Sequence, residues 1–163
     1  MNTSILFPAG TAAQMLGLSL LIGGMLALGA FTAPVLFKTF PRAEAGEAMT
    51  VMFRRYDMVL LVGLGMILIG EVLRMVAAGM PHLSFLSGLR YGTLALLTGL
   101  MLFSILNINA QIESMQQAGV RHGATEEGRQ FTQTHQLSEK LYKIELMAAA
   151  LLLILTPFVQ RQP

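Results

Sequence analysis

The sequence contains no cysteine, and charged residues make up only 12% of its 163 positions. Without cysteine, the chain can form no disulfide, no thiolate metal site and no cysteine nucleophile. The 11 Lys and Arg residues exceed the 9 Asp and Glu residues by only two, which excludes the basic surface of a nucleic-acid-binding module. Because soluble domains have about a quarter of their residues charged, the composition also excludes a disordered chain and an ordinary cytosolic enzyme.

Apolar residues are abundant instead, at 54% of the chain, and the mean hydropathy is +0.62. Four apolar runs approach the roughly 20 residues with which a helix crosses about 30 Å of hydrocarbon. They cover residues 12–37, 58–78, 91–108 and 141–158. We therefore predict an all-α fold, an integral membrane four-helix bundle formed by one domain over residues 1–163. Its surroundings are the lipid bilayer, and nucleic acid is not a partner.

The cations indicate which ends of the spans face the cytoplasm, because Lys and Arg resist translocation across the membrane. Eight of them lie in, or just beyond, the segments 38–57 and 109–140, and three lie on the opposite side. We therefore predict that these two segments are cytoplasmic and that both termini lie outside. The predicted localisation is the cell membrane, in several passes, and the inner membrane if the chain is bacterial.

The two cytoplasmic segments are predicted to be helical. In the first, apolar residues recur at i, i+3, i+4 and i+7 from Met49, which indicates a helix that lies along the interface or runs straight into the second span. In the second, Gly119 is expected to end one helix and Thr125 to cap the next. If the last helix continues to Thr156, helices three and four extend into the cytoplasm as a hairpin.

Small residues recur at helical spacing in the first three spans. They are Ala13, Gly17 and Gly24; Gly63 and Gly70; and Gly88, Gly92, Ala95 and Gly99. Lipid provides no hydrophobic force between helices, so small residues that let backbones approach are typical of helix contacts. We expect these stripes to form contacts inside the bundle, or one of them to form a face for self-association into a homo-oligomer.

Two charged residues interrupt the second span, where ionisable groups are costly and are functional candidates by default. Glu71 lies 13 residues into this span, and Arg74 follows one turn later. They can form a local ion pair whose arginine extends outward. The alternative is a proton or cation relay in which Arg90, from the neighbouring helix, is a second partner.

A larger polar group gathers where the spans meet the cytoplasmic segments. Its members are Tyr56, Asp57, Asn107, Asn109, Gln111, His135, Ser138, Glu139, Lys143 and Glu145. A spacing of four places His135, Glu139 and Lys143 on one helix face. These residues can serve solvation and helix-end hydrogen bonding alone. Alternatively, His135 can respond to protons or contact a ligand, because histidine titrates close to neutral pH.

Three motifs resemble the transmembrane protein 205-like family, a group of small four-span proteins that includes a bacterial domain of unknown function. The first is Leu36-Phe37, Pro41-Arg42, Gly46, Phe53 and Tyr56, the second is Asn109-Ala110, and the third is Phe131, His135 and Ser138. Four residues after this serine, the family has an asparagine where the chain has Tyr142. The resemblance implies the four-span fold. It also places Tyr56, Asn109, His135 and Ser138 at the cytoplasmic ends of the helices, as a candidate site or a structural clasp.

The leading functional hypothesis is a small oligomeric protein of the cytoplasmic membrane that binds or transports a solute, a metal complex or a lipid at this cytoplasmic rim. One alternative is a membrane redox subunit that uses haem, quinone or a metal, with His135 as an axial ligand. Another is a structural or accessory protein that docks a partner through its cytoplasmic hairpin. The sequence assigns no cofactor, catalytic residue or metal site, and it favours binding or transport over an enzyme.

Overall fold

The fold is all-helical, as predicted. The computed structural model describes residues 3–79, 84–120, 123 and 125–159. Its elements are α1 (Thr3–Leu26), η1 (Ala27–Thr32), α2 (Ala33–Thr39), α3 (Arg42–Ala78), α4 (Phe85–Phe103), η2 (Ser104–Asn109), α5 (Ala110–Gln117) and α6 (Glu126–Val159). The two η segments are π-helical turns. Each continues its neighbours without a break, so the described residues form four long helical rods.

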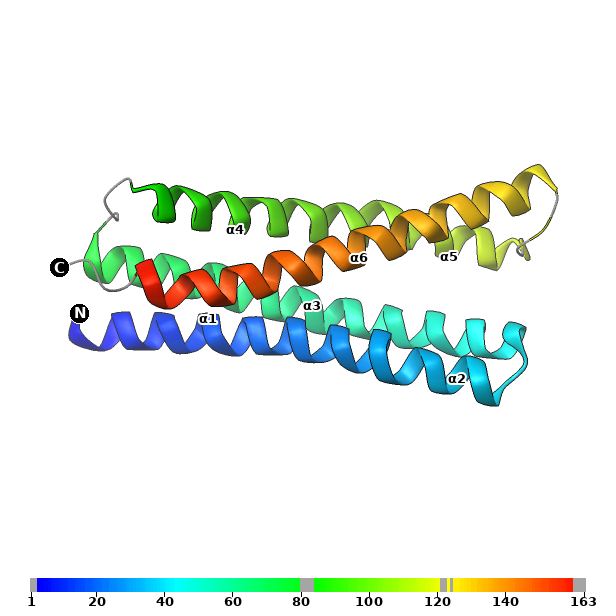
Figure 1. Cartoon of the computed structure of the whole chain (residues 1–163), viewed down its shortest axis with the longest axis horizontal. Helices are drawn as coiled ribbons and strands as arrows, with labels where there is room; N and C mark the ends of the chain where they lie inside the picture. The colour runs from blue at the N-terminus through cyan, green and yellow to red at the C-terminus, as the bar shows by residue number, and fades with distance from the viewer. Residues whose placement is uncertain (1–2, 80–83, 121–122, 124, 160–163) are drawn as a thin grey trace.

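The rods lie side by side with alternating direction (Figure 1). α1 packs mainly on α3, and α4 packs mainly on α6. The start of α1 and the end of α6 lie at the same end of the bundle, which we call the terminal end. The α2–α3 turn lies at the opposite end, beside α5 and the start of α6. There Arg54 of α3 forms an ion pair with Glu113 of α5 at 2.7 Å. The predicted hairpin of helices three and four is therefore packed against the start of α3 at this end.

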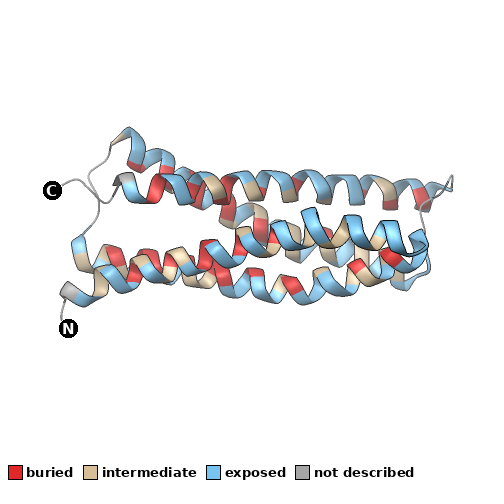
Figure 2. Cartoon of the chain, turned by 60° about the horizontal axis from the view of Figure 1, so that its bottom comes forward, coloured by how far each residue is buried: buried red, intermediate tan, exposed pale blue. Residues whose placement is uncertain are grey.

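The surface of the bundle is apolar enough to face lipid. Among the described residues, three helical stretches have the length and composition to cross a membrane: Ile5–Thr39, Arg42–Ala78 and Phe85–Gln117. Exposed residues run along the whole length of the rods (Figure 2), and many of them are large and apolar, whereas soluble proteins rarely expose extensive apolar patches. The prediction of apolar helices long enough to span a membrane is confirmed for these three stretches, which are candidate spans, and the span at residues 141–158 stays a prediction.

Several predicted helix ends agree with the structure. α3 runs unbroken from Arg42, so the apolar face that begins at Met49 continues straight into the second span rather than lying apart from it. Gly119 ends the α5 rod with a φ of +76°, a conformation that favours glycine. The Thr125 hydroxyl accepts a hydrogen bond from the Gly128 N–H at 3.1 Å, at the start of a continuous α6.

Two helices begin earlier than their predicted spans. α1 starts at Thr3, and α4 starts at Phe85 instead of residue 91. The Ser84 hydroxyl caps α4 by accepting a hydrogen bond from the Ser87 N–H at 3.2 Å. Arg90 therefore lies inside the helix, because the interior of the bundle provides partners for its charge.

Glycines allow α1 and α3 to approach closely. A Cβ atom added at Gly17 would lie 2.5 Å from the Gly63 carbonyl oxygen, and one added at Gly10 would lie 2.6 Å from that of Gly70. We call this the α1–α3 glycine contact. Gly17, Gly63 and Gly70 were predicted from the sequence, and Gly10 was not.

The small residues of α4 behave differently. Gly88, Gly92, Ala95 and Gly99 are all exposed, and no atom lies within 4 Å of a Cβ added at any of the three glycines. The expectation that this stripe contacts another helix of the same chain is therefore wrong for the residues that the structure describes. Helical spacing identified a face of α4 but not what covers it.

An apolar core fills the middle of the bundle. Its fully buried members include Leu18, Leu21, Ile67, Leu97 and Leu152, which come from all four rods. Polar side chains are buried on both sides of this core, one group near the terminal end and one near the π-helical turns. These two groups are the candidate sites.

Candidate binding site in the helix bundle

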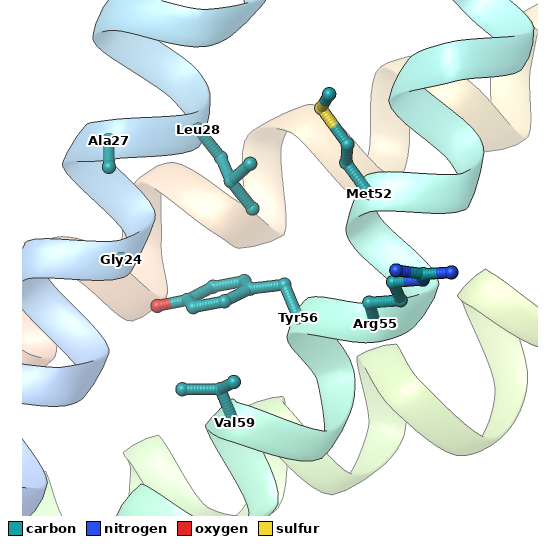
Figure 3. A pocket seen from close by; sticks show the side chains of 7 residues that line it. All are labelled: Gly24, Ala27, Leu28, Met52, Arg55, Tyr56 and Val59. Carbon is teal, nitrogen blue, oxygen red and sulfur yellow. The ribbon is translucent and has the colours of Figure 1, made fainter.

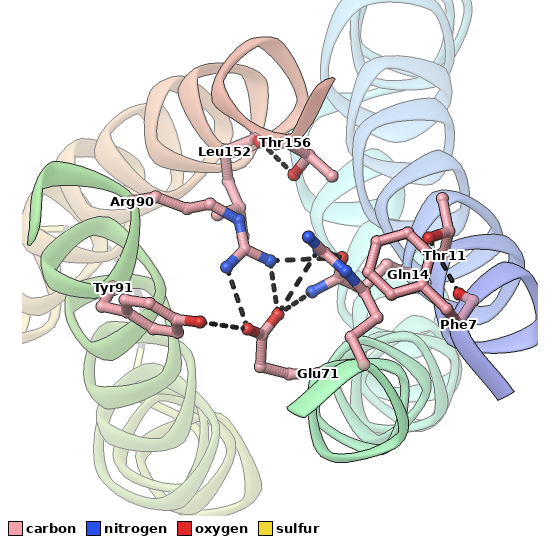
Figure 4. Close-up of polar contacts among 9 residues, drawn as sticks. Phe7, Thr11, Gln14, Glu71, Arg90, Tyr91, Leu152 and Thr156 are labelled. Atoms are coloured by element: carbon pink, nitrogen blue, oxygen red, sulfur yellow. Dashed lines mark hydrogen bonds and ion pairs between the residues drawn. The ribbon is translucent and has the colours of Figure 1, made fainter. Parts of the chain in front are cut away.

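Five polar side chains meet between three helices near the terminal end (Figure 4). They are Gln14 of α1, Glu71 and Arg74 of α3, and Arg90 and Tyr91 of α4, and we call them the arginine cluster. Gln14 and Arg90 are 0% exposed, Glu71 is 5% exposed and Arg74 is 6% exposed. The cluster therefore contains two cations and one anion that the protein shields from its surroundings.

Glu71 is the centre of the cluster. Arg90 donates two hydrogen bonds to its carboxylate, one of them from Nη1 to Oε1 at 2.9 Å and the other from Nη2 to Oε2. The Tyr91 hydroxyl donates to Oε1 at 2.8 Å, and the Gln14 amide donates to Oε2. Two-pronged arginine–carboxylate pairs are among the strongest hydrogen-bonded contacts, so Glu71 and Arg90 neutralise each other's charge.

Arg74 is bound less directly. Its Nη1 donates to the Gln14 Oε1 at 2.6 Å and lies 3.7 Å from the Glu71 Oε2. Its guanidinium carbon lies 5.4 Å from the centre of the Phe7 ring, a cation–π distance. Among the described residues, the buried Nε atoms of Arg74 and Arg90 have no hydrogen-bond partner.

This geometry revises the interpretation of Glu71 and Arg74 as a local ion pair, which was made from the sequence. Arg74 does not extend outward from Glu71 but points into the bundle, and Arg90 makes the main contact with Glu71. Gln14 and Tyr91 were not predicted as members. A signal for Gln14 was available, because it shares a helix face with Gly10 and Gly17 and is the only amide in the first apolar run. Whether the pair is functional stays a prediction.

The second polar group lies at the level of the two π-helical turns. It contains Tyr56 and Asp57 of α3, Ser104 and Asn109 of η2, and Tyr142 and Glu145 of α6, and we call it the carboxylate layer. Asn109 Nδ2 donates to both carboxylate oxygens of Asp57, at 3.0 and 3.1 Å. The Ser104 hydroxyl donates to the Glu145 Oε1 at 2.5 Å. Both carboxylates are thus bound by η2.

The two tyrosines of the layer bind the backbone of α1. The Tyr56 hydroxyl donates to the Leu21 carbonyl at 2.8 Å and to the Leu20 carbonyl at 3.1 Å. The Tyr142 hydroxyl donates to the Met25 carbonyl, two residues before η1 begins at Ala27. Tyr142 therefore has a specific structural role at the position where the resembled family has asparagine. Gly24 makes room for the Tyr56 ring, because a Cβ there would lie 2.2 Å from a ring carbon.

The four residues of the predicted rim site have different surroundings. Tyr56 and Asn109 belong to the carboxylate layer and are linked to it through α1 carbonyls and Asp57. His135 is exposed, and its ring stacks on Phe131 with ring centres 6.3 Å apart. Ser138 is half-buried on α6. The function of these four residues stays a prediction.

Further along the predicted His135 face, Lys143 donates a hydrogen bond to Glu139 at 2.7 Å. This hydrogen bond and the charge of Lys143 hold the pKa of the Glu139 carboxyl below its ordinary value. Both side chains are more than half exposed, so the pair belongs to the surface of α6. It brings no charge into the bundle.

A shallow hollow of about 340 Å³ lies between α1, η1 and α3 (Figure 3). The Tyr56 ring forms part of its wall, and the other lining residues are apolar except Arg55. No group of three or more His, Asp or Glu residues that could hold a metal ion is present in the part of the chain that the structure describes. The sequence contains two histidines besides His135, and both of them, His82 and His122, lie outside the described residues.

Fold and sites together define an all-helical protein with apolar, membrane-length helices and two buried polar groups. The chain matches the family model for a domain of unknown function, DUF4149, over residues 16–119, and it belongs to this family. The matched part begins in α1 and ends at the C-terminal cap of α5, so it includes four of the five members of the arginine cluster. Searches of curated proteins and of solved structures find no match.

Proposed function

We propose that this protein is a four-span protein of the cell membrane that binds a small solute between its helices and carries it across the bilayer. The fourth span in this proposal is the apolar second half of α6. The excess of cations around the α2–α3 turn and the start of α6 supports a cytoplasmic location for that end. Both termini then lie outside, and the resemblance to the transmembrane protein 205-like family is part of the same proposal.

The observation that carries the proposal is the arginine cluster. Three ionisable side chains are buried in a bundle whose exterior is apolar, with the amide of Gln14 and the hydroxyl of Tyr91 directed at the same carboxylate. Charged groups at membrane depth are expensive, and they mark solute or ion pathways by default. The carboxylate layer provides polar groups on the other side of the apolar core, so a solute that crosses the bundle has polar contacts on both sides.

The four spans of this proposal form one unit and not two inverted repeats, so the proposed carrier works as an assembly of copies. The exposed α4 stripe of Gly88, Gly92, Ala95 and Gly99 is the face we propose for this self-association. A purely structural role, in which the cluster only fastens helices, is the competing outcome.

Flux into proteoliposomes tests the proposal directly. The full chain is reconstituted and tested with labelled glycerol, acetate, phosphate and rubidium ion, which cover neutral, anionic and cationic solutes. We expect uptake of at least one probe above protein-free vesicles and its loss in Gln14→Leu. The matched control is Leu16→Gln, which changes an exposed residue of the same helix. Leakage equal to empty vesicles for all four probes would overturn the transport function.

A further inference from the structure

The arginine cluster carries more positive than negative charge. Glu71 is the one anion among its five members, and Arg74 and Arg90 are both cations. Arg90 makes the two-pronged contact with Glu71, so the charge of Arg74 is the one that lacks a matching anion. Arginine does not give up its proton inside proteins. The excess charge therefore persists in the buried site.

The partners of Arg74 do not neutralise it. Gln14 contributes only an amide dipole, at 2.6 Å from Nη1, and the Phe7 ring contributes only its quadrupole. Glu71 is 3.7 Å away and already accepts hydrogen bonds from Arg90, Tyr91 and Gln14. A buried charge without a matching partner is strongly unfavourable. An anion that binds Arg74 would supply the counter-charge that the other members of the cluster do not provide.

The cluster also has unused donors. The Nε atoms of Arg74 and Arg90 are both buried, and neither has a partner among the described residues. A guanidinium presents its N–H groups as a planar fork that matches the oxygens of a carboxylate or a phosphate. Both guanidinium groups lie close to the Glu71 carboxylate: Arg90 donates to both of its oxygens, and the Arg74 Nη1 lies 3.7 Å from Oε2.

The position of Arg74 suits a ligand that arrives from the terminal end. Arg74 lies four residues before Ala78, the last residue of α3, which is about 6 Å along the helix axis. Gly10 allows Arg74 to lie against α1, because a Cβ there would be 2.9 Å from the Arg74 Cγ. The guanidinium is thus held close to the terminal end of the bundle but inside the protein.

We propose that Arg74 is the recognition group of a binding site for an oxyanion, either the free carboxylate or phosphate of a small solute or the phosphate of a lipid headgroup. This inference deepens the proposed function and rests on it for the role of the cluster as a solute site. It excludes metal cations and other cationic solutes as ligands, because the excess charge repels them.

Binding of inorganic phosphate to the purified full chain tests the inference. The protein is kept in mild detergent and a zwitterionic buffer with little chloride, and its affinity and melting temperature are measured as phosphate is added. Wild type is expected to bind phosphate and to melt at higher temperature. Arg74→Gln is expected to bind it about tenfold more weakly or worse. The matched control, Arg55→Gln, removes an exposed arginine from the same helix and should bind as wild type does.

A second arm distinguishes the two sources of the oxyanion. Wild type, Arg74→Gln and Arg55→Gln are placed in nanodiscs of phosphatidylcholine with and without phosphatidylglycerol, and retained lipid is identified by native mass spectrometry. Retention of phosphatidylglycerol that depends on Arg74, without an effect of phosphate, assigns the site to a lipid headgroup. If neither phosphate nor phosphatidylglycerol binds, or if Arg74→Gln binds them as well as wild type, the inference is overturned.

The stability of the variants without oxyanion provides an independent readout. Because Arg74→Gln removes an unmatched charge, it should melt at the same temperature as wild type or higher, and a large decrease would contradict the charge argument. Should this variant fail to fold, that argument is overturned, and Arg74→Lys, which keeps the charge and loses the fork, decides about binding. Phosphate binding without flux contradicts transport alone, whereas flux of glycerol or rubidium without oxyanion binding contradicts the oxyanion site alone.

Discussion

The arginine cluster and the carboxylate layer join the two pairs of rods in different ways. Both connect the α1–α3 pair of rods to the α4–α6 pair, one near the terminal end and one at the π-helical turns. In the layer, each carboxylate has its own donor: Asn109 for Asp57 and Ser104 for Glu145. In the cluster, the other four side chains share the carboxylate of Glu71, and two buried nitrogen atoms have no partner among the described residues.

The carboxylate layer shows that helices can be held together without an excess of arginine. The layer connects the rods through one-to-one hydrogen bonds and tyrosine contacts with α1 carbonyls. A cluster that served only to fasten helices could do the same with Glu71 and Arg90 alone. The presence of Arg74 is the feature that the structural role leaves unexplained.

The largest expected effect comes from removing the shared carboxylate of the cluster. Glu71→Gln leaves Arg74 and Arg90 buried without an anion, and breaking a buried ion pair in this way costs about 3–5 kcal/mol. The free energy of unfolding in mixed micelles measures it. Glu139→Gln, at an exposed pair on α6, is the control and should cost no more than about 1 kcal/mol. Equal effects of the two substitutions would remove the distinction between buried and surface charge.

The next effect separates the two glycine stripes. In Gly17→Ala, the new methyl group meets the Gly63 carbonyl oxygen at 2.5 Å, so α1 and α3 must move apart at a cost of about 3 kcal/mol, the upper end for overpacking. Gly92→Ala meets no atom within 4 Å and should gain up to about 1 kcal/mol from helix propensity. Thermal melting in detergent compares them.

A larger substitution at Gly92 tests the proposed self-association. If the α4 stripe contacts a second copy, Gly92→Leu should lower the molecular mass of the protein–detergent complex measured by light scattering. Met147→Leu, at an exposed position of α6, should leave the mass unchanged. A monomeric wild type would overturn this face as an interface, and the stripe would then be lipid-facing surface.

A smaller effect is expected in the carboxylate layer, because each contact there is separate. Ser104→Ala removes the hydrogen bond to Glu145 and leaves this buried carboxylate with one donor fewer, at a cost of about 1–2 kcal/mol. Ser19→Ala is the matched control: the Ser19 hydroxyl is exposed and donates to the Met15 carbonyl of its own helix. A change within about 0.5 kcal/mol is expected for Ser19→Ala, and the same loss in both would contradict the role of Ser104.

Much of the fold follows from the sequence, because apolar length and helix caps are local signals. Gly119 and Thr125 marked their helix ends correctly, since a positive φ and an N-terminal hydroxyl are requirements of single positions. The charge of Arg90 ends the third apolar run at residue 91, whereas the helix itself begins at Phe85. A charged residue ends an apolar run in the sequence, but in the bundle it is bound by Glu71 from another helix.

The site was less predictable because it depends on which helix faces meet. Glu71 and Arg74 stood out as charges in an apolar run. Gln14 and Tyr91 could not be assigned to Glu71 from the sequence, because only the packing of α1 and α4 brings them to its carboxylate. The π-helical turns that position Asn109 and Ser104 have no sequence signal of their own. Similarly, the α4 glycines have the same spacing as a contact face, and only packing shows that they face outward.

The smallest effect is expected at the Glu139–Lys143 pair of α6, which is exposed, unlike the arginine cluster and the carboxylate layer. Lys143 lowers the pKa of Glu139 from its ordinary value of 4.5, by its hydrogen bond and by its charge. The stability that the pair contributes is therefore fully present above that ordinary value and is lost as the pH falls through the lowered pKa. Because both side chains are mostly exposed, this contribution is below about 1 kcal/mol.

Lys143→Gln removes the cation and should return the pKa of Glu139 toward 4.5. An NMR titration of the Glu139 carboxyl measures that shift, and melting temperatures over the same acidic range measure the stability. Lys140→Gln, also exposed on α6, is the matched control and should leave the titration of Glu139 unchanged. If both variants shift it equally, the cause is the general charge of this surface and not the contact, and screening by added salt should then abolish the shift in wild type as well.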